Sequence, residues 1–177
     1  LQAEVVRIAA GRRAAPRANL LMIQSDAAFE ARDYARCEAL LREALALEPD
    51  DPDLLFRHGH ALVQLGQPEP AERALRAALE QREAQLVWRL GAGEPYQAEL
   101  LLGIIASARG GFDEAIARFT RARDLNPYLT GAHHLLAATH ELMGRRDEAQ
   151  RAVAAGLAVD PHDARLREID RRLRAAR

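Results

Sequence analysis

Cysteine, lysine and aromatic side chains are scarce or missing in this chain of 177 residues. Its single Cys excludes an internal disulfide framework and a zinc site built on cysteines, and all 25 of its basic residues are Arg. Only 5% of the residues are aromatic. No uninterrupted apolar run approaches the ~20 residues that a membrane-spanning helix needs, so we expect no membrane insertion.

What the chain has in abundance is alanine, leucine, arginine and glutamate, all of which favour helices. Ala and Leu alone supply 63 residues, and 49% of the chain is hydrophobic by a broad count, which is enough for a packed core. The composition therefore predicts an all-α fold and argues against both an all-β fold and disorder.

Charge is distributed unevenly along the chain, although the net charge is only −1. Residues 1–18 carry four Arg against one Glu, and residues 163–177 carry six Arg against three acids, whereas the stretch between them has a net charge of −7. A nucleic-acid-binding protein normally concentrates basic residues on one face, and here the middle is acidic. We therefore expect no nucleic-acid partner.

Several series of residues repeat with one period of 34, interrupted by one insertion of ten. Small residues form two such series: Cys37, Ala71, Ala115 and Ala149, and then Ala44, Ala78, Ala122 and Gly156. Large apolar residues form a third: Leu41, Leu75, Phe119 and Val153. Glycines recur at Gly66, Gly110 and Gly144, and prolines at Pro49, Pro127 and Pro161.

This spacing is typical of a helix–turn–helix unit. Small residues seven apart lie on one helical face and let neighbouring helices approach closely, and the large residue between them fills the space that remains. Glycine suits the left-handed end of the first helix, and proline cannot continue the second helix. Acids such as Asp113 and Asp147 are favourable where the second helix begins.

The pattern resembles the tetratricopeptide repeat (TPR) family, in particular bacterial proteins with four repeats. The third repeat carries the clearest match: Gly103, Gly110, Phe112, Ala115, Phe119, Ala122 and Pro127. The sequence departs from the family pattern at Ser25, Ala137 and Gly156, and the second repeat lacks its closing proline. The resemblance implies a right-handed superhelix of antiparallel helix pairs, an α-solenoid. The predicted repeats, numbered 1 to 4, are residues 18–51, 52–85, 96–129 and 130–162.

The insertion falls at residues 86–95, where a second helix that begins at Pro70 is expected to continue to Leu90 and to end in a Gly-Pro loop. It contains the only tryptophan, Trp88. Two interpretations stay open: Trp88 packs against a neighbouring helix, or it forms a protruding tip that gives a partner a second contact.

Both ends of the chain lie outside the four repeats. Residues 163–177 predict an amphipathic capping helix with Leu166, Ile169 and Leu173 on its apolar side. Residues 1–17 form an N-terminal helix or leader, and residues 7–16 are too polar for a signal-peptide core. We expect a cytoplasmic location; a periplasmic one would require a signal removed before residue 1.

No residues form a recognisable catalytic, cofactor or metal site. His133 and His140 are seven apart, which is too far for both to bind one ion, and His58 and His60 point in different directions. Cys37 stands where the repeat requires a small buried residue, so we expect an inert thiol. The sequence therefore predicts a protein that is not an enzyme and needs no cofactor or metal.

In the family that the chain resembles, the first helices of the repeats line a concave groove that binds peptides or helices. The groove-facing places are the second, fifth, ninth, twelfth and thirteenth of each repeat, called concave-face positions below. Family members that bind chaperone C-termini carry Lys and Asn at the fifth and ninth, and these are absent here. The expected partner-binding residues are Met22, Asp26, Phe29, Phe56, His60, Val63, Leu100, Ile104 and Ser107.

These positions form a largely apolar strip edged by acids, which suits an amphipathic helix or an apolar peptide with some basic character. The strip could instead be covered by the chain itself, through residues 1–15 or the long helix. Two functions fit: a protein–protein interaction scaffold or assembly module, or a substrate-recruiting TPR domain of a larger enzyme such as a transferase. The sequence leaves the partner and the oligomeric state open.

Overall fold

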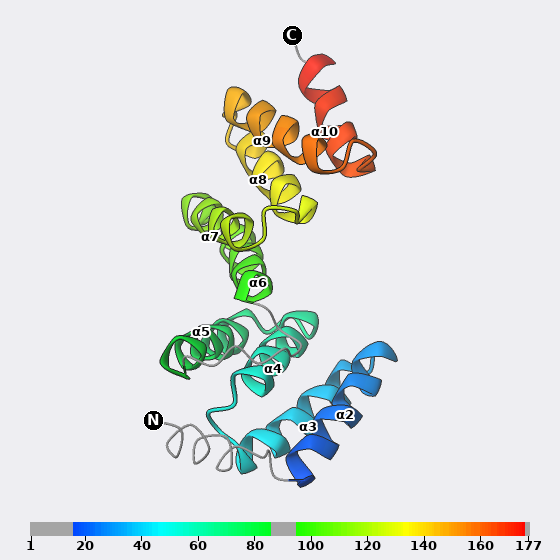
Figure 1. Cartoon of the computed structure of the whole chain (residues 1–177), viewed down its shortest axis with the longest axis vertical. Coiled ribbons are helices and arrows are strands. Elements are labelled where there is room, and N and C mark those ends of the chain that lie inside the picture. The colour runs from blue at the N-terminus through cyan, green and yellow to red at the C-terminus, as the bar shows by residue number, and fades with distance from the viewer. Residues whose placement is uncertain (1–15, 86–94, 176–177) are drawn as a thin grey trace, which may run out of the picture. The chain divides into compact units, whose positions relative to one another are not determined.

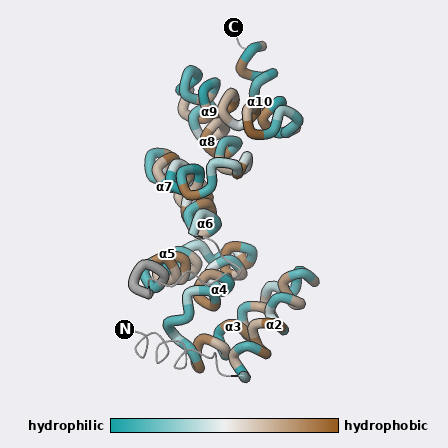
Figure 2. Tube along the Cα trace, in the orientation of Figure 1, coloured by the Kyte–Doolittle hydropathy of each residue, from teal (hydrophilic) through white to brown (hydrophobic). Residues whose placement is uncertain are grey.

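The described part of the computed structural model, residues 16–85 and 95–175, consists of helices and turns and contains no strand, which confirms the all-α prediction (Figure 1). The chain divides into two compact units, Leu1–Gly93 and Glu94–Arg177, called the N-terminal and C-terminal units here. Figure 2 shows hydrophobic and hydrophilic residues interspersed along the helices of both, as expected for helices with one buried side.

Among residues 16–85, the N-terminal unit contains two antiparallel helix pairs. Its helices are α2 (Pro16–Glu30), α3 (Tyr34–Leu47), α4 (Pro52–Gln64) and α5 (Pro68–Gln85). The C-terminal unit contains two more pairs and a last single helix. Its helices are α6 (Pro95–Ala108), α7 (Phe112–Leu125), α8 (Thr130–Leu142), α9 (Arg146–Val159) and α10 (Ala164–Ala175). In each unit the helices of a pair pack on each other, and the exact repeat boundaries stay a prediction.

The repeating small and large residues form the core, as predicted. All members of the three series from the sequence are buried on α3, α5, α7 and α9. Each large residue packs opposite a small residue of the preceding helix: a Cβ added to Gly59 would lie 2.7 Å from Cγ of Leu75, and one added to Gly103 would lie 2.4 Å from Cε1 of Phe119. The residue opposite is therefore small because the large side chain occupies its space.

The departures from the family pattern fit the same packing. Ser25 and Ala137 occupy the places that correspond to Gly59 and Gly103, and both are buried. Ser25 satisfies its hydroxyl by donating to the carbonyl of Met22 at 2.7 Å. Ala137 shares a core cluster with Val153, the smallest of the four large residues, so a larger residue on one helix accompanies a smaller one on the other.

The turns inside the helix pairs use the left-handed backbone conformation. Gly66, Gly110 and Gly144 have φ values of 69°, 79° and 69°, which confirms their role at the end of the first helix. In the first pair this place is taken by Arg32, with φ of 60°. Arginine adopts this conformation at a cost that glycine does not have.

Helix α5 begins two residues earlier than predicted, at Pro68, so that Pro70 also lies in the first turn, where a missing N–H does no harm. The structure describes this helix up to Gln85, and it is longer than α3, α7 and α9. The expected continuation to Leu90 and the surroundings of Trp88 lie outside the described residues. Of the expected N-terminal helix or leader at residues 1–17, only Pro16 and Arg17 are described, and they begin α2.

Helix α10 is the predicted capping helix. Its apolar side, formed by Leu166, Ile169 and Leu173, is buried in a cluster with Ala137, Ala149 and Val153. The carboxylate of Asp163 caps its start by accepting hydrogen bonds from the N–H groups of Arg165 and Leu166, at 2.9 Å and 3.1 Å.

Candidate partner-binding site

In the N-terminal unit, the concave-face positions of α2 and α4 bring an aromatic cluster together. The ring of His60 lies 4.6 Å from that of Phe29 and 6.0 Å from that of Phe56, measured between ring centroids. Phe29 also meets Tyr34 edge to face at 5.2 Å. Three of the chain's eight aromatic residues therefore meet at one place, together with a histidine.

An ion pair borders this aromatic cluster. Arg57 of α4 donates to the carboxylate of Asp26 on α2, and the arginine is mostly buried while Asp26 is about half exposed. Burial lowers the pKa of Arg57 and also lowers the pKa of His60 below its usual value. At neutral pH the face therefore carries a neutral imidazole between the phenylalanines and a compensated charge beside them.

Beside Met22 the surface has a small open depression of about 40 Å³. Its floor is apolar, and acidic side chains from the loop after α3 and the start of α4 surround it. The residues that line it are Ala18, Asn19, Met22, Glu48, Asp51, Asp53 and Leu54. Met22 is partly buried and packs on the core of the unit.

Phe56 does not match its predicted role as an exposed contact. Its exposed fraction is only 6%, and with Leu54 it belongs to the buried side of α4. The expectation followed from the concave-face position of Phe56 in its repeat. In the structure the side chain turns into the interior, where its ring packs near the ring of His60. Val63 of the same helix is half-buried.

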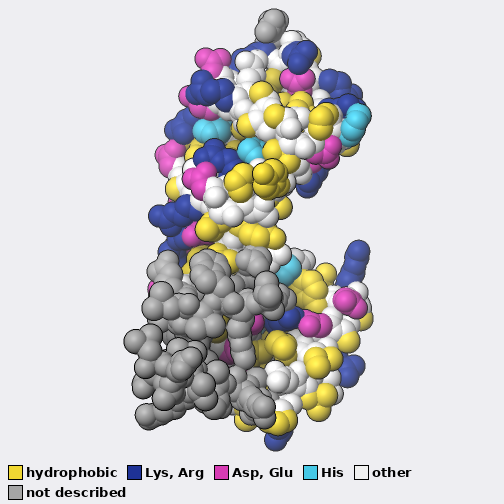
Figure 3. Space-filling model, in the orientation of Figure 1, with side chains coloured by type: hydrophobic (Ala, Val, Ile, Leu, Met, Phe, Trp, Pro, Cys, Tyr) yellow, Lys and Arg dark blue, Asp and Glu magenta, His cyan; other side chains and the backbone are white. Residues whose placement is uncertain are grey.

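In the C-terminal unit, the predicted partner-binding residues of α6 are aliphatic or small. Ile104 of α6 is 40% exposed, while Leu100 and Ser107 are half-buried, and Leu100 packs against the core cluster of Phe119 and Leu136. Figure 3 shows hydrophobic side chains at the surface of both units. The two units therefore offer different chemistry, aromatic with charge in the first and aliphatic in the second.

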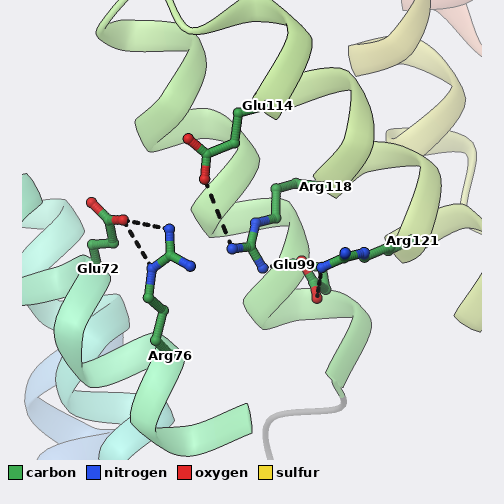
Figure 4. A network of polar contacts seen from close by, with 6 residues as sticks. All are labelled: Glu72, Arg76, Glu99, Glu114, Arg118 and Arg121. Carbon is green, nitrogen blue, oxygen red and sulfur yellow. Dashed lines mark hydrogen bonds and ion pairs between the residues drawn. The ribbon is translucent and has the colours of Figure 1, made fainter. Parts of the chain in front are cut away.

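Ion pairs lie both within single helices and between the two helices of a pair, as Figure 4 shows. In the C-terminal unit, Glu99 of α6 is buried and accepts from Arg118 of α7 at 3.0 Å, with Arg121 at 3.8 Å from its other oxygen. In the N-terminal unit, Arg76 donates twice to Glu72 of the same helix, at 2.7 Å and 2.9 Å.

Helix α10 covers part of the concave-face positions of α8. Arg172 makes two hydrogen bonds to the carboxylate of Glu141, at 2.7 Å and 3.1 Å, and these lower the pKa of Glu141. Burial lowers the pKa of His134, and the charge of Arg165 lowers it further. Ala138 packs on the apolar cluster of α10.

Within the described ranges, no three His, Cys, Asp or Glu side chains gather to bind a metal ion. Cys37 is buried, and this burial, followed by the charges of Asp33 and Glu38, raises its pKa to about 11. The thiolate that a nucleophile requires is therefore strongly disfavoured. None of the helices that the structure describes is long and apolar enough to cross a bilayer.

Two residues of this site were not among the expected partner-binding residues: Tyr34 of the aromatic cluster and Arg57 of the ion pair beside it. Arg57 is the only basic residue of α4 apart from histidines, and one period earlier its place holds the apolar Ile23. A polar residue in an otherwise apolar series is the signal that could have identified it. Tyr34 begins α3, away from the first helices, so no argument about concave-face positions would have included it.

A model of the tetratricopeptide repeat family matches residues 28–93 and 106–173, which is more than half of the chain. The chain therefore belongs to the TPR family. No curated protein matches it.

Several solved structures share the fold. One is YrrB, described as a TPR protein with an unusual peptide-binding site; it is 20% identical, with a TM-score of 0.69, over 83% of this chain and 71% of that one. MamA from Desulfovibrio magneticus RS-1 is 18% identical, with a TM-score of 0.73, over 86% and 81%. Cut9, in the APC/C hetero-tetramer Cut9-Hcn1, is 16% identical with a TM-score of 0.77, over 86% and 29%.

Proposed function

We propose that this protein is an interaction scaffold that binds a peptide or an amphipathic helix of a partner protein through its concave-face positions, and that it is not itself catalytic. The observation that carries the proposal is the cluster of Phe29, Phe56 and His60 beside the Asp26–Arg57 pair. In a chain with few aromatic residues, such a cluster at a partly exposed surface is typical of a binding anchor.

The chemistry of the positions favours an apolar ligand with some basic character. Met22, Phe29, Val63, Leu100 and Ile104 supply apolar surface. Glu30 supplies negative charge on α2 beside the compensated Asp26–Arg57 pair, while Ser107 adds a neutral polar group on α6. A ligand that is recognised by its terminal carboxylate is disfavoured, because the Lys and Asn of the family's carboxylate-binding members are missing.

The likeness to YrrB supports a peptide as the ligand, since that TPR protein is described as having a peptide-binding site. Phe56 enters the proposal as a supporting residue because it is buried. Trp88, the proposed second contact, stays a prediction from the sequence.

The test uses peptides selected from a random phage-displayed library on the full chain, with binding measured by fluorescence anisotropy. Met22→Gln should weaken binding of peptides that dock on the N-terminal unit about tenfold or more, and Ile104→Glu should do the same for peptides that dock on the C-terminal unit. In each case a buried polar or charged group without a partner opposes the ligand's apolar side chain. Far-UV circular dichroism and thermal unfolding establish that both variants are folded.

The matched controls are Ala39→Gln for Met22→Gln and Ala117→Glu for Ile104→Glu, which place the same side chain on exposed positions of the second helices α3 and α7. These variants should bind the selected peptides as the parent chain does. Equal loss of binding in controls and test variants, or full binding by folded Met22→Gln and Ile104→Glu, would show that the ligand binds elsewhere.

A further inference from the structure

One face of α2 is exposed although it is apolar. Leu20 is 55% exposed and Ile23 is 62% exposed, and Ala27, one turn further along, is exposed as well. Leucine and isoleucine next to each other on one helical face are normally covered, because covering them removes apolar surface from water. The other repeats show what covers the same face.

The residues equivalent to Leu20 and Ala27 are buried wherever a helix pair precedes them in the same unit. At the place of Ile23, Arg57 and Leu135 are half-buried and Ile169 is buried. Leu54 of α4, one period after Leu20, is 2% exposed, and Ala61, one period after Ala27, is fully buried. Ala132 of α8 and Leu166 of α10, which stand at the place of Leu20, are fully buried as well. The exposed face of α2 is thus the face on which repeats of this chain stack.

The residue that covers this place stands ten positions earlier in the chain. A Cβ added to Gly156 would lie 2.5 Å from Cδ1 of Leu166, so the small residue of the preceding helix fits directly on the next helix. Ala44 stands ten before Leu54 and shares a core cluster with it. The small residues are therefore what allows the next helix to approach.

Ten positions before Leu20 stands Ala10, and seven before that stands Ala3. Both continue the two small-residue series by one more period, since Ala3 precedes Cys37 by 34 and Ala10 precedes Ala44 by 34. Val6 stands at the place of Leu40, which packs against the core in α3. Two residues depart from the pattern: Arg7 stands at the place of the buried Leu41, and Gly11 at the place of Leu45, which packs against the same core.

We propose that residues 1–13 are the second helix of one more repeat pair and that they dock on the Leu20–Ile23–Ala27 face of α2 in the register in which α3 docks on α4. The segment lies outside the described residues, so the proposal rests on its sequence register and on the face that α2 presents. A segment docked on this face does not lie on the concave-face positions of α2, so these remain open to a partner.

The test places the photo-crosslinking amino acid p-benzoylphenylalanine at Ile23 of the full chain and maps the products by mass spectrometry. A mixture of isotopically light and heavy protein separates crosslinks within one chain from crosslinks between copies. Crosslinks from position 23 to residues 1–13 of the same chain support the proposal. Crosslinks between copies, or none to residues 1–13, overturn it. The same probe at Ala39, on the exposed side of α3, should not reach residues 1–13.

Two neighbouring substitutions test the register. Ala10→Glu places a charge against Leu20 and should accelerate hydrogen exchange of the α2 amides about tenfold or more, whereas Ala9→Glu, pointing about 100° away on a helix, should change it little. Equal effects of the two substitutions, or no effect of either, would overturn the docking register. Because the readout is confined to α2, it does not depend on binding to the concave-face positions.

Discussion

Replacing Gly103 by alanine should destabilise the chain, although alanine is the better helix former by about 1 kcal/mol. The added Cβ would lie 2.4 Å from Cε1 and 2.6 Å from Cδ1 of Phe119. The ring is only 1% exposed, so it has no solvent-filled space into which it could turn. Overpacking of this kind costs about 1–3 kcal/mol, so we expect a net loss of up to about 2 kcal/mol.

A second substitution should compensate for the first. The fourth repeat combines Ala137 with Val153 at the same two places, which indicates that the larger residue on one helix requires the smaller one on the other. Phe119→Val alone should cost about 2–4 kcal/mol by leaving a cavity. Combined with Gly103→Ala, the new methyl group fills part of that cavity, and the double variant should be more stable than the sum of the single changes by about 1–3 kcal/mol.

The assay is urea unfolding of the parent chain, both single variants and the double variant, followed by far-UV circular dichroism. Gly131→Ala is the matched control, because no heavy atom lies within 4 Å of the Cβ it would add; it should be neutral or stabilise by up to about 1 kcal/mol. Additivity within about 0.5 kcal/mol, or a Gly103→Ala variant as stable as the parent chain, would refute the packing argument.

Three other outcomes follow from the described residues. Arg32→Gly should raise the free energy of unfolding by about 0.5–1 kcal/mol by relieving the left-handed backbone, whereas Arg42→Gly inside α3 should lower it by about 1 kcal/mol; urea unfolding measures both. The free energy of unfolding should fall as the pH drops below about 6.5, because burial lowers the folded-state pKa of His60 and the unfolded chain then binds more protons. The His60→Gln variant should show a shallower fall of this free energy between about pH 7.5 and pH 5.5. An unchanged slope would contradict this cause. Cys37, whose pKa is raised to about 11, should react with a thiol reagent at the rate of global unfolding, and fast reaction in native buffer would show that it is accessible.

The sequence predicted the packing inside each helix pair well because that packing is local and repeats. Cys37 and Ala44 could be assigned to the core from their period alone, since a residue seven positions along a helix returns to the same face. The left-handed turn at Gly110 could be predicted in the same way, because glycine is the one residue that adopts a left-handed backbone without cost. Extending that series by one period would also have identified Arg32.

The candidate site was less predictable because its positions depend on contacts between helices of different repeats. Phe56 stands at a concave-face position in the sequence, yet it turns inward, and no local pattern separates this outcome from exposure. Arg57 contacts Asp26 across 31 residues, so neither side chain shows its partner in the sequence. Periodicity predicts which face of a helix is buried, but it does not say which side chains meet across two faces.

The capping helix decides which concave-face positions remain available in the C-terminal unit. On α8, Glu141 is bound by Arg172 and Ala138 packs on the apolar side of α10, so a ligand would have to displace a bidentate ion pair and part of a core cluster to reach them. On α6, Ile104 remains 40% exposed. Since displacing these contacts costs free energy that a ligand must supply, binding in this unit should depend on α6 more than on α8.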